Sequence, residues 1–409
     1  MKNQPSPPLP INRRILVVGY GRANRATAYT HRIKGICSSL ANARYDVTLL
    51  WLTPFYSCSS SQFRVLRSQL RVIVWPTLPV FSVRPLTVVS RFVFSLTIAL
   101  LLVVLRPACV HAETAGVAAL VPPRRVRCPL VMDLHGDELA ELSMAGMKEW
   151  RIRQAEADLQ AAAQRADAIV CVSENLKNTL LRHNTLARIP MCIAPCGVNV
   201  EQFAAERCRR VQARQRLNVA DRLVVCYSGG LATWQCVGET LELVRQLRDK
   251  DGRVFFLLLT HHDPARWDTA LRRVGTPVRD YQVLSLTPED VPKWLSAGDL
   301  GLLLRRPSPV NAVASPTKLG EYLAAGMPVV TTQHAGDAPE IIRHSACGYV
   351  LEDVAVGTGE LDVIHTLLCS VVADRERVAS RCVHAARNYQ SWAVSTQRIT
   401  ELYANLLST

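Results

Sequence analysis

Short apolar stretches that end in glycine stand near the start of each half of the chain. Residues 14–19 read RILVVG, and residues 223–230 read LVVCYSGG. Apolar stretches of this length predict strands that are buried on both faces, and sequence of helical character follows each of them. Alternating strands and helices are typical of a parallel sheet covered by helices. The chain is therefore expected to contain two doubly wound α/β domains.

The alternation also predicts where the two domains meet. The expected strands are residues 14–19, 45–51, 72–75, 108–112, 129–134 and 168–172, followed by residues 223–230, 254–259, 280–284, 300–304 and 328–331. A length of 409 residues suits two hydrophobic cores better than one. We expect a Rossmann-like domain at residues 1–198 and a second one from residue 199. Two such domains would face a central cleft, with ligands beyond the carboxyl ends of the strands.

The composition is that of a globular, basic protein. The formal net charge is +14, which attracts anions in general. We find neither a zinc-finger spacing nor a basic-aromatic RNA motif, so nucleic acid is not an expected partner. Thirteen cysteines without a repeated spacing favour reduced thiols in the cytoplasm and no metal site. Residues 1–10 are rich in proline and are expected to form a loose tail, without a signal peptide.

One uncharged segment, residues 92–105 (FVFSLTIALLLVVL), lies between Arg91 and Arg106. As a helix it would extend about 21 Å, less than the roughly 30 Å of a bilayer's hydrocarbon core. We therefore expect a helix in the domain core or at a membrane interface rather than a spanning one, and we prefer the core.

The segment of residues 314–328, ASPTKLGEYLAAGMP, is the most informative in the chain. Ser315 suits a helix N-cap, and Pro316 suits the first helical position. Gly326 suits the position just beyond a helix, so the segment predicts a helix at residues 316–325.

Lys318 would lie in the first turn of this helix. The helix dipole is positive there and disfavours a cation by about 0.3–1 kcal/mol. A bound phosphate would explain the lysine, because backbone N–H groups and the ammonium would both point at the anion. Glu321 lies on the same face about one turn further on, where its carboxylate could accept hydrogen bonds from a ribose diol. The alternative is a solvated Lys–Glu pair on the helix surface.

The sequence SPTKLGEYLAAGMPVV resembles the donor-site segment of family 4 glycosyltransferases, which have the GT-B fold. The resemblance runs along nearly the whole chain, through residues 106–111 (RPACVH), 172–177 (VSENLK), 195–199 (PCGVN), 227–230 (YSGG) and 392–407. It implies a donor domain at residues 199–386 and a C-terminal helix, within residues 387–409, that crosses back to an acceptor-side first domain.

The resemblance implies roles for matching residues of the second domain. Glu321 would bind the ribose, and Lys318 would contact the diphosphate. Gly229 and Gly230 would let the backbone approach the donor phosphate, and the backbone of Val283 would meet the nucleobase. The expected donor-binding residues are Gly229, Gly230, Val283, Ser315, Thr317, Lys318 and Glu321.

The first domain has its own expected site residues. His135 matches a family histidine that touches the transferring sugar, although a histidine at the end of a strand can also be purely structural. Gly19 and Gly21 would face the cleft. Asp137 and Glu138 would bind an acceptor hydroxyl or face solvent.

The chain departs from the family pattern in its charges. Val313 stands where the family commonly has a second glutamate, and Gly230 and Gln235 stand where it usually has an arginine and a lysine. A departing diphosphate needs compensation of its negative charge. We expect Lys318, together with Arg305 or its neighbour Arg306, to provide it, and we expect His135, Lys318 and Arg305 to be the catalytic residues.

The resemblance implies a retaining, metal-independent glycosyltransferase without a cofactor. It would move a sugar from a nucleotide-sugar donor to a glycan or lipid-linked acceptor, as in surface polysaccharide biosynthesis, and could work at the anionic inner face of a membrane. Three alternatives stay open: a sugar-nucleotide epimerase on the same fold, a non-catalytic nucleotide-sugar-binding protein, and a dinucleotide oxidoreductase. The last is weakly indicated, because Asn24 replaces the third glycine of its fingerprint.

Overall fold

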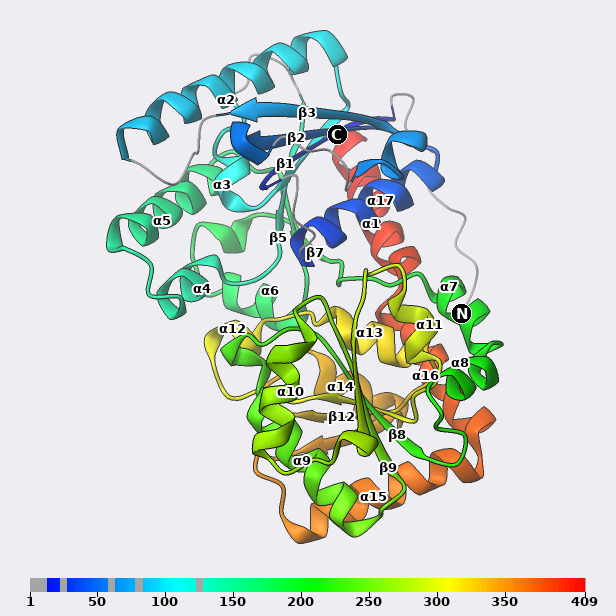
Figure 1. The fold of residues 1–409 in the computed structure, drawn as a ribbon. Coiled ribbons are helices and arrows are strands. Elements are labelled where there is room, and N and C mark those ends of the chain that lie inside the picture. Colours follow the sequence, from blue (N-terminus) through cyan, green and yellow to red (C-terminus); the bar gives the residue numbers. More distant parts are fainter. Residues whose placement is uncertain (1–12, 23–27, 58–62, 78–83, 123–127, 409) are drawn as a thin grey trace. The chain divides into compact units, whose positions relative to one another are not determined.

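The computed structural model describes residues 13–22, 28–57, 63–77, 84–122 and 128–408, so the expected proline-rich tail lies outside the described residues. The chain divides into two compact units (Figure 1). The first comprises residues 1–195 and 392–409, and the second comprises residues 196–391. Each unit contains one parallel sheet with helices between its strands. The expected fold class, two doubly wound α/β domains, is confirmed.

The first unit has a seven-stranded parallel sheet in the order β3-β2-β1-β4-β5-β6-β7. Its strands are β1 Arg14–Tyr20, β2 Asp46–Pro54, β3 Arg71–Thr77, β4 Cys109–Glu113, β5 Leu130–Leu134, β6 Ala168–Cys171 and β7 Met191–Ile193. The strand order reverses between β1 and β4. Ligands of open α/β sheets bind at such a switch point, beyond the carboxyl ends of the strands.

Helices connect these strands. They are α1 Ala28–Asn42, α2 Arg84–Leu105, α3 Ala115–Ala118, α4 Glu138–Met144, α5 Glu149–Ala163, α6 Glu174–Leu180 and α17 Trp392–Leu407, with short 3-10 turns at Phe55–Ser57, Leu66–Ser68 and Leu186–Arg188. The C-terminal helix α17 packs on α1 and β7. Gly146, with φ +61°, separates α4 from α5.

The second unit has a six-stranded parallel sheet in the order β10-β9-β8-β11-β12-β13. Its strands are β8 Leu223–Ser228, β9 Val254–Thr260, β10 Tyr281–Ser285, β11 Leu300–Leu303, β12 Val329–Thr332 and β13 Gly348–Leu351. The strand order reverses between β8 and β11. The second switch point therefore lies beyond Ser228 and Leu303, and this is where the donor-site segment would have to come.

The helices of the second unit are mostly short. They are α7 Val200–Arg207, α8 Arg210–Arg216, α9 Val237–Lys250, α10 Pro264–Arg273, α11 Val291–Leu295, α12 Pro309–Ala312, α13 Thr317–Ala324, α14 Ala338–Ser345, α15 Thr358–Ala373 and α16 Arg375–Tyr389, with 3-10 turns at Thr233–Gln235 and Val278–Asp280. Helix α13 contacts α16, β11 and β12, which holds its N-terminus near the carboxyl end of β11.

Helix α2 differs from the sequence-based expectation in length and burial. It has 22 residues, and at 1.5 Å per residue it extends about 33 Å. Within the described residues it is the one helix long and apolar enough to cross a membrane, and only 17% of its apolar window is buried. The preferred expectation, a core helix, is therefore wrong. Its buried side consists of Thr87, Ser90, Phe94 and Ile98, spaced three or four residues apart.

Candidate functional site

Polar residues of the second unit gather beyond the carboxyl ends of three neighbouring strands. Gly229 and Gly230 follow β8, His262 comes two residues after β9, and Arg305 comes two residues after β11. Lys318 is the second residue of α13. Since β8 and β11 flank the switch point of this sheet, the cluster occupies the position where open α/β sheets bind ligands.

Lys318 is held by two uncharged groups. Its Nζ donates a hydrogen bond to Oε1 of Gln235 and lies 4.3 Å from the centre of the Tyr227 ring. Burial lowers the pKa of Lys318 well below its usual value; the charge of Arg305 acts in the same direction and the carboxylate of Glu321 opposes it. An ammonium that is desolvated in this way would be stabilised by an anion placed beside it.

Glu321 lies one turn beyond Lys318 on α13. Its Oε2 accepts a weak hydrogen bond, 3.4 Å long, from the hydroxyl of Ser228 at the end of β8. Burial raises the pKa of Glu321, while Lys318 and Ser228 lower it. The neighbouring Tyr322 accepts a 2.7 Å hydrogen bond from the backbone N–H of Ser228, which fixes α13 against this strand. The carboxylate therefore stands in a defined position with capacity for further hydrogen bonds.

The two glycines after β8 are required by their surroundings. Gly229 has φ +152°, and a Cβ atom there would collide with Nζ of Lys318. A Cβ atom on Gly230 would come within 2.8 Å of Nε2 of His262. Any side chain at these positions would displace Lys318 or His262, so glycine is what lets the backbone approach the cluster.

The structure distinguishes between the two candidate arginines. Arg305 is 5% exposed, and its Nη1 donates to the carbonyl of Leu304. The side chain of Arg306 is 65% exposed and forms an ion pair with Glu239 at the start of α9. Arg305 is therefore the cation that acts on Lys318, whereas Arg306 faces solvent.

Three expected donor-site residues have different local environments. Ser315 is not the N-cap of α13: the cap position is Pro316, without a side-chain cap bond, and the helix begins at Thr317. The hydroxyl of Ser315 instead accepts a 3.1 Å hydrogen bond from the backbone N–H of Cys196. The helix begins one residue later than the sequence pattern suggested, so Ser315 precedes the cap position. Val283 lies in the edge strand β10 with its side chain packed against the core.

Sequence reasoning missed three polar residues of this cluster. The rings of His261 and His262 are 4.1 Å apart, just after β9. Burial lowers the pKa of His261, and His262 and Lys318 act in the same direction. Gln235, noted only as a departure from the family pattern, is the acceptor for Lys318. The sequence did contain a signal for the two histidines, because they follow the strand predicted at residues 254–259. The carboxyl ends of parallel strands meet at one edge of the sheet, where ligands bind.

The first unit holds a buried ionic network centred on β4 and β5, beside the switch point of its sheet. Nη2 of Arg32 lies 3.0 and 2.9 Å from the two carboxylate oxygens of Asp133. His111 lies 3.2 Å from Asp133 on one side of its ring and 2.7 Å from the Tyr403 hydroxyl on the other. Burial alone would raise the pKa of Asp133, but Arg32 and the histidines around it, His135 and His111, lower it well below its usual range. Arg32 binds both oxygens of Asp133 and is itself 1% exposed, so it cannot move into solvent to make room for a metal.

His135 lies at the least buried end of this network, with 16% of its side chain exposed. Its Nε2 lies 2.7 Å from Oε2 of the fully buried Glu113, and its ring contacts that of Tyr29 in a tilted arrangement, with centroids 5.2 Å apart. Within the described residues its Nδ1 is buried without a hydrogen-bond partner. Sequence reasoning found His135 but not Glu113, which comes from a different strand. One ring nitrogen of His135 is therefore held and the other is left to bind something else.

The remaining expected residues of the first unit have structural explanations. A Cβ atom on Gly19 or Gly21 would come within 2.8 or 2.9 Å of the Trp51 side chain. Oδ1 of Asp137 accepts a 3.0 Å hydrogen bond from the N–H of Ala140 and so caps α4. Glu138, the first residue of that helix, is exposed. The contacts of Gly19, Gly21 and Asp137 account for these three residues without a substrate.

Two sequence models match the chain, one in each half. A model of Glycosyltransferase Family 4 matches residues 30–202, and a model of Glycosyl transferases group 1 matches residues 222–359. Together they cover more than half of the chain. The chain belongs to the family 4, group 1 glycosyltransferases. This confirms the resemblance carried by the segment around Lys318.

A curated relative and several solved structures extend the comparison. The chain is 27% identical over 169 residues to a putative teichuronic acid biosynthesis glycosyltransferase, TuaH, of Bacillus subtilis (strain 168). That match spans 41% of this chain and 41% of the relative, less than half of its length. A glycosyltransferase from Rickettsia africae ESF-5 has a TM-score of 0.70 at 14% identity, over 98% of this chain and 100% of its own. Anabaena HepE in complex with UDP has a TM-score of 0.69 at 17% identity, over 96% and 100%. The present chain thus has the GT-B fold.

Proposed function

We propose that this glycosyltransferase transfers a sugar from a nucleoside diphosphate to the hydroxyl of a glycan or lipid-linked acceptor. The observation that carries the proposal is the partly buried, desolvated ammonium of Lys318 in the first turn of α13, beside Gly229 and one turn from Glu321. The UDP in the HepE complex supports a nucleotide sugar as donor, and the name of the Bacillus relative supports surface polysaccharide as the product.

In the proposed complex the second unit binds the donor. Backbone N–H groups of α13 and the ammonium of Lys318 face the diphosphate, with Arg305 adding a second positive charge. Gly229 and Gly230 leave room for the phosphate oxygens, and Glu321 accepts hydrogen bonds from the ribose diol. The cations act on charge that grows as the diphosphate departs, so they stabilise the transition state more than the bound donor.

The transfer proposed is a retaining one. The acceptor oxygen bonds to the anomeric carbon while the bond from that carbon to the diphosphate oxygen breaks, and the acceptor's proton passes to the departing diphosphate. Attack on the face that the nucleotide leaves preserves the configuration. Lys318 and Arg305 supply the charge compensation for which other transferases use a divalent cation, and we propose that this step needs no metal. His135, with Nδ1 available, is proposed to contact the transferring sugar.

Calorimetric titration with UDP, GDP and ADP, followed by transfer assays with the sugar nucleotide of the base that binds best, tests the proposal. The variant Lys318→Met, which keeps the volume, should weaken diphosphate binding and lower turnover by about 10²-fold or more. Lys293→Met on α11 is the matched control, because Lys293 lies over the Trp294 ring and outside this cluster. Unchanged binding and turnover in Lys318→Met would overturn the assignment. Tight donor binding without any product would favour the binding-protein alternative, and an altered donor sugar would favour an epimerase.

Helix α2 favours a membrane-bound acceptor. Its outward side is apolar from Val88 to Val104: Val88, Val89, Phe92, Val93, Leu96, Leu100, Val103 and Val104 are all more than two-fifths exposed. Figure 1 shows α2 running along the outside of the first unit. Burying this side in lipid would remove it from water, which stabilises by about 25 cal/mol per Å². The exposed Arg14, which donates to the carbonyl of Leu105, and the exposed Arg106 place positive charge at the same end of the helix.

The contacts of α2 favour a helix that lies in the membrane surface. It connects β3 and β4 of one sheet, and Arg91 on its inner side binds the carboxylate of Asp158 on α5 at 2.9 and 2.5 Å. Phe94 packs edge-on against Tyr20. A spanning helix would have to give up these contacts, whereas an interfacial helix keeps them. We therefore propose peripheral attachment to the anionic cytoplasmic face of a membrane, with α2 parallel to the surface.

Flotation with anionic and with neutral liposomes at low salt tests this attachment. We expect the protein to float with anionic vesicles, to be released by alkaline washing, and to lose flotation in the double variant Leu96→Glu, Leu100→Glu. Val211→Glu, an equally exposed apolar residue of the second unit, is the control. Absence of the wild-type protein from the floating fraction would exclude the interfacial role, and retention after alkaline washing would indicate a spanning helix instead.

A further inference from the structure

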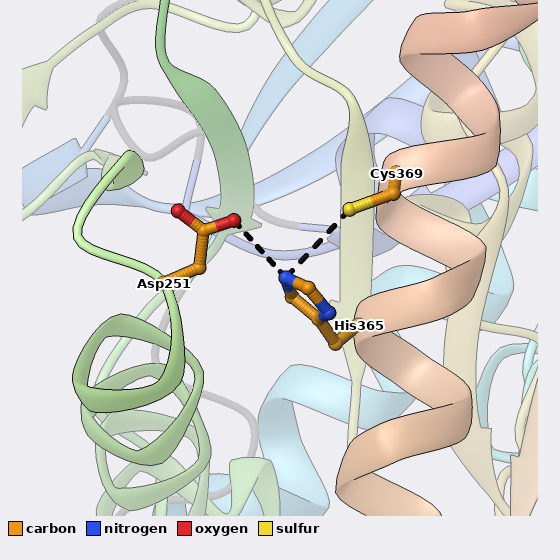
Figure 2. Close-up of side chains that lie close together, drawn as sticks. All are labelled: Asp251, His365 and Cys369. Atoms are coloured by element: carbon orange, nitrogen blue, oxygen red, sulfur yellow. Dashed lines mark hydrogen bonds and ion pairs between the residues drawn. The ribbon is translucent and has the colours of Figure 1, made fainter.

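Three metal-binding side chains of the second unit converge away from the donor cluster. Asp251 is the residue after α9, and His365 and Cys369 lie four residues apart on α15. Figure 2 shows the imidazole of His365 between the carboxylate of Asp251 and the thiol of Cys369. Asp251 precedes β9, so this cluster lies toward the amino ends of the strands, whereas the donor cluster lies beyond their carboxyl ends. The two sites are therefore separate.

The spacing of the ligand atoms suits one tetrahedral ion. Oδ2 of Asp251 lies 3.0 Å from Nε2 of His365, and Sγ of Cys369 lies 3.6 Å from the same nitrogen. The three ligand atoms all lie within 4.8 Å of one another. Around a tetrahedral zinc ion, with bonds of about 2.0–2.3 Å, neighbouring ligand atoms stand roughly 3.4–3.6 Å apart. Small side-chain rotations would bring these atoms onto that geometry.

Hydrogen bonds from Arg253 orient the carboxylate of Asp251, and solvent can reach a fourth coordination position. Oδ1 of Asp251 accepts hydrogen bonds of 2.9 and 3.1 Å from the N–H and Nε of Arg253, which orient the carboxylate as outer-shell partners orient metal ligands. Nη2 of Arg253 also lies 2.7 Å from Oδ2, but this side chain is 59% exposed and can move into solvent when a cation arrives. His365 is 22% exposed, so water can reach the fourth position.

We propose that Asp251, His365 and Cys369 bind one zinc ion through Oδ2, Nε2 and Sγ, with water as the fourth ligand. The thiol releases its proton to solvent as the zinc–sulfur bond forms. One aspartate, one histidine and one cysteine, with nitrogen and sulfur among the donors, select zinc over magnesium or calcium. The ion would tie the end of α9 to α15, two helices that already pack together, and so would stabilise the second unit.

Metal analysis and cobalt substitution of the full chain test this site. Protein purified in the presence of zinc should hold about one ion per chain after gel filtration. Loading with cobalt instead should give a thiolate-to-cobalt charge-transfer band and the visible absorption of a tetrahedral ion. Cys369→Ser should abolish the charge-transfer band, and His365→Gln should lower the zinc content. Cys208, the residue that follows α7, is exposed, and among the described atoms its thiol hydrogen-bonds only to the carbonyl of Ala204. The variant Cys208→Ser is therefore the matched control and should keep both signals.

Zinc should also raise the thermal midpoint of the wild-type protein and of Cys208→Ser, but not of Cys369→Ser. Nucleoside diphosphate binding is measured on the same samples to show that each variant is folded. The proposal is overturned if cobalt produces no thiolate band in the wild-type protein. It is equally overturned if Cys369→Ser and His365→Gln retain the full zinc content, because the three side chains would then be a hydrogen-bonded contact and nothing more.

Discussion

Buried and partly buried ionisable groups lie near the carboxyl ends of strands in both sheets, but their charges are arranged differently. In the first unit two carboxylates, Asp133 and Glu113, face the guanidinium of Arg32 and two histidines. In the second unit two cations, Lys318 and Arg305, face a single carboxylate. In the first network each buried carboxylate has an arginine or histidine side chain within hydrogen-bonding distance. The second has one positive charge more than its carboxylate can balance.

The difference distinguishes a framework from a binding site. A buried charge needs a partner, and where the chain provides it in full, as for Asp133, removal of one member leaves the other stranded. Where the chain does not provide it, as for Lys318, a ligand of opposite charge completes the group. The first network is therefore expected to matter chiefly for stability, except at His135, and the second chiefly for binding.

The largest expected effect is on the first network. Replacing Arg32 with methionine would leave the buried carboxylate of Asp133 without its main partner and should lower the free energy of unfolding by about 3–5 kcal/mol. Urea unfolding followed by circular dichroism measures it. Arg153→Ala removes an exposed pair with Glu149 on α5 and should change stability by no more than about 0.5 kcal/mol. Equal effects of the two variants would show that burial does not decide the role of these pairs.

The second effect, of about 1–3 kcal/mol, concerns the approach of the backbone to Lys318. In Gly229→Ala the new methyl group would meet Nζ of Lys318, at a backbone φ of +152° that alanine rarely adopts. Nucleoside diphosphate affinity should fall about tenfold or more, measured by calorimetry. Gly238→Ala on α9, where a Cβ atom meets nothing within 4 Å, should bind normally and be slightly more stable. Normal binding by Gly229→Ala would place the diphosphate elsewhere.

The sequence determined the fold more closely than the site. Runs such as residues 223–228 and 254–260 are buried along their whole length, so their apolar character was visible without the structure. The strands β7 and β13 were missed because they have three and four residues and are mostly half-buried. Helix α2 was predicted too short because Arg91 ended the apolar run. Its exposure could not be predicted, since composition does not show which side of a helix meets the protein.

The site was predicted where its chemistry is local and missed where it is not. Lys318 and Glu321 share one helix, so the unusual charge in the first turn was visible in the sequence. Glu113 and His135 come from different strands, and Gln235 reaches Lys318 from a 3-10 turn 83 positions away. Such contacts depend on the strand order, which the sequence alone does not provide.

The third effect has the opposite sign from the first. Lys318→Met should raise the free energy of unfolding by about 0.5–2 kcal/mol while it impairs transfer, because a desolvated cation is costly to the folded state without its ligand. Folding lowers the pKa of Lys318, so the unfolded chain binds more protons and the stability of the wild type rises with pH. The advantage of the variant should therefore be full below the lowered pKa of the folded state and shrink as the pH rises from there toward 10.5, the ordinary lysine value. Denaturation at several pH values measures this, and a constant difference would mean that the ammonium is not desolvated.

The smallest expected effect separates two neighbours in sequence. Arg306→Ala removes a largely exposed ion pair with Glu239 and should alter stability by less than about 1 kcal/mol, with diphosphate affinity nearly unchanged. Arg305→Ala, in contrast, removes the cation that acts on Lys318 and should weaken diphosphate binding. Calorimetry measures the diphosphate affinity of both variants. The salt concentration is kept the same, because salt screens exposed charges and has much less effect on buried ones. If Arg306→Ala bound the diphosphate as poorly as Arg305→Ala, the surplus charge would belong to the general basic surface, and the contrast between the two units would not rest on burial.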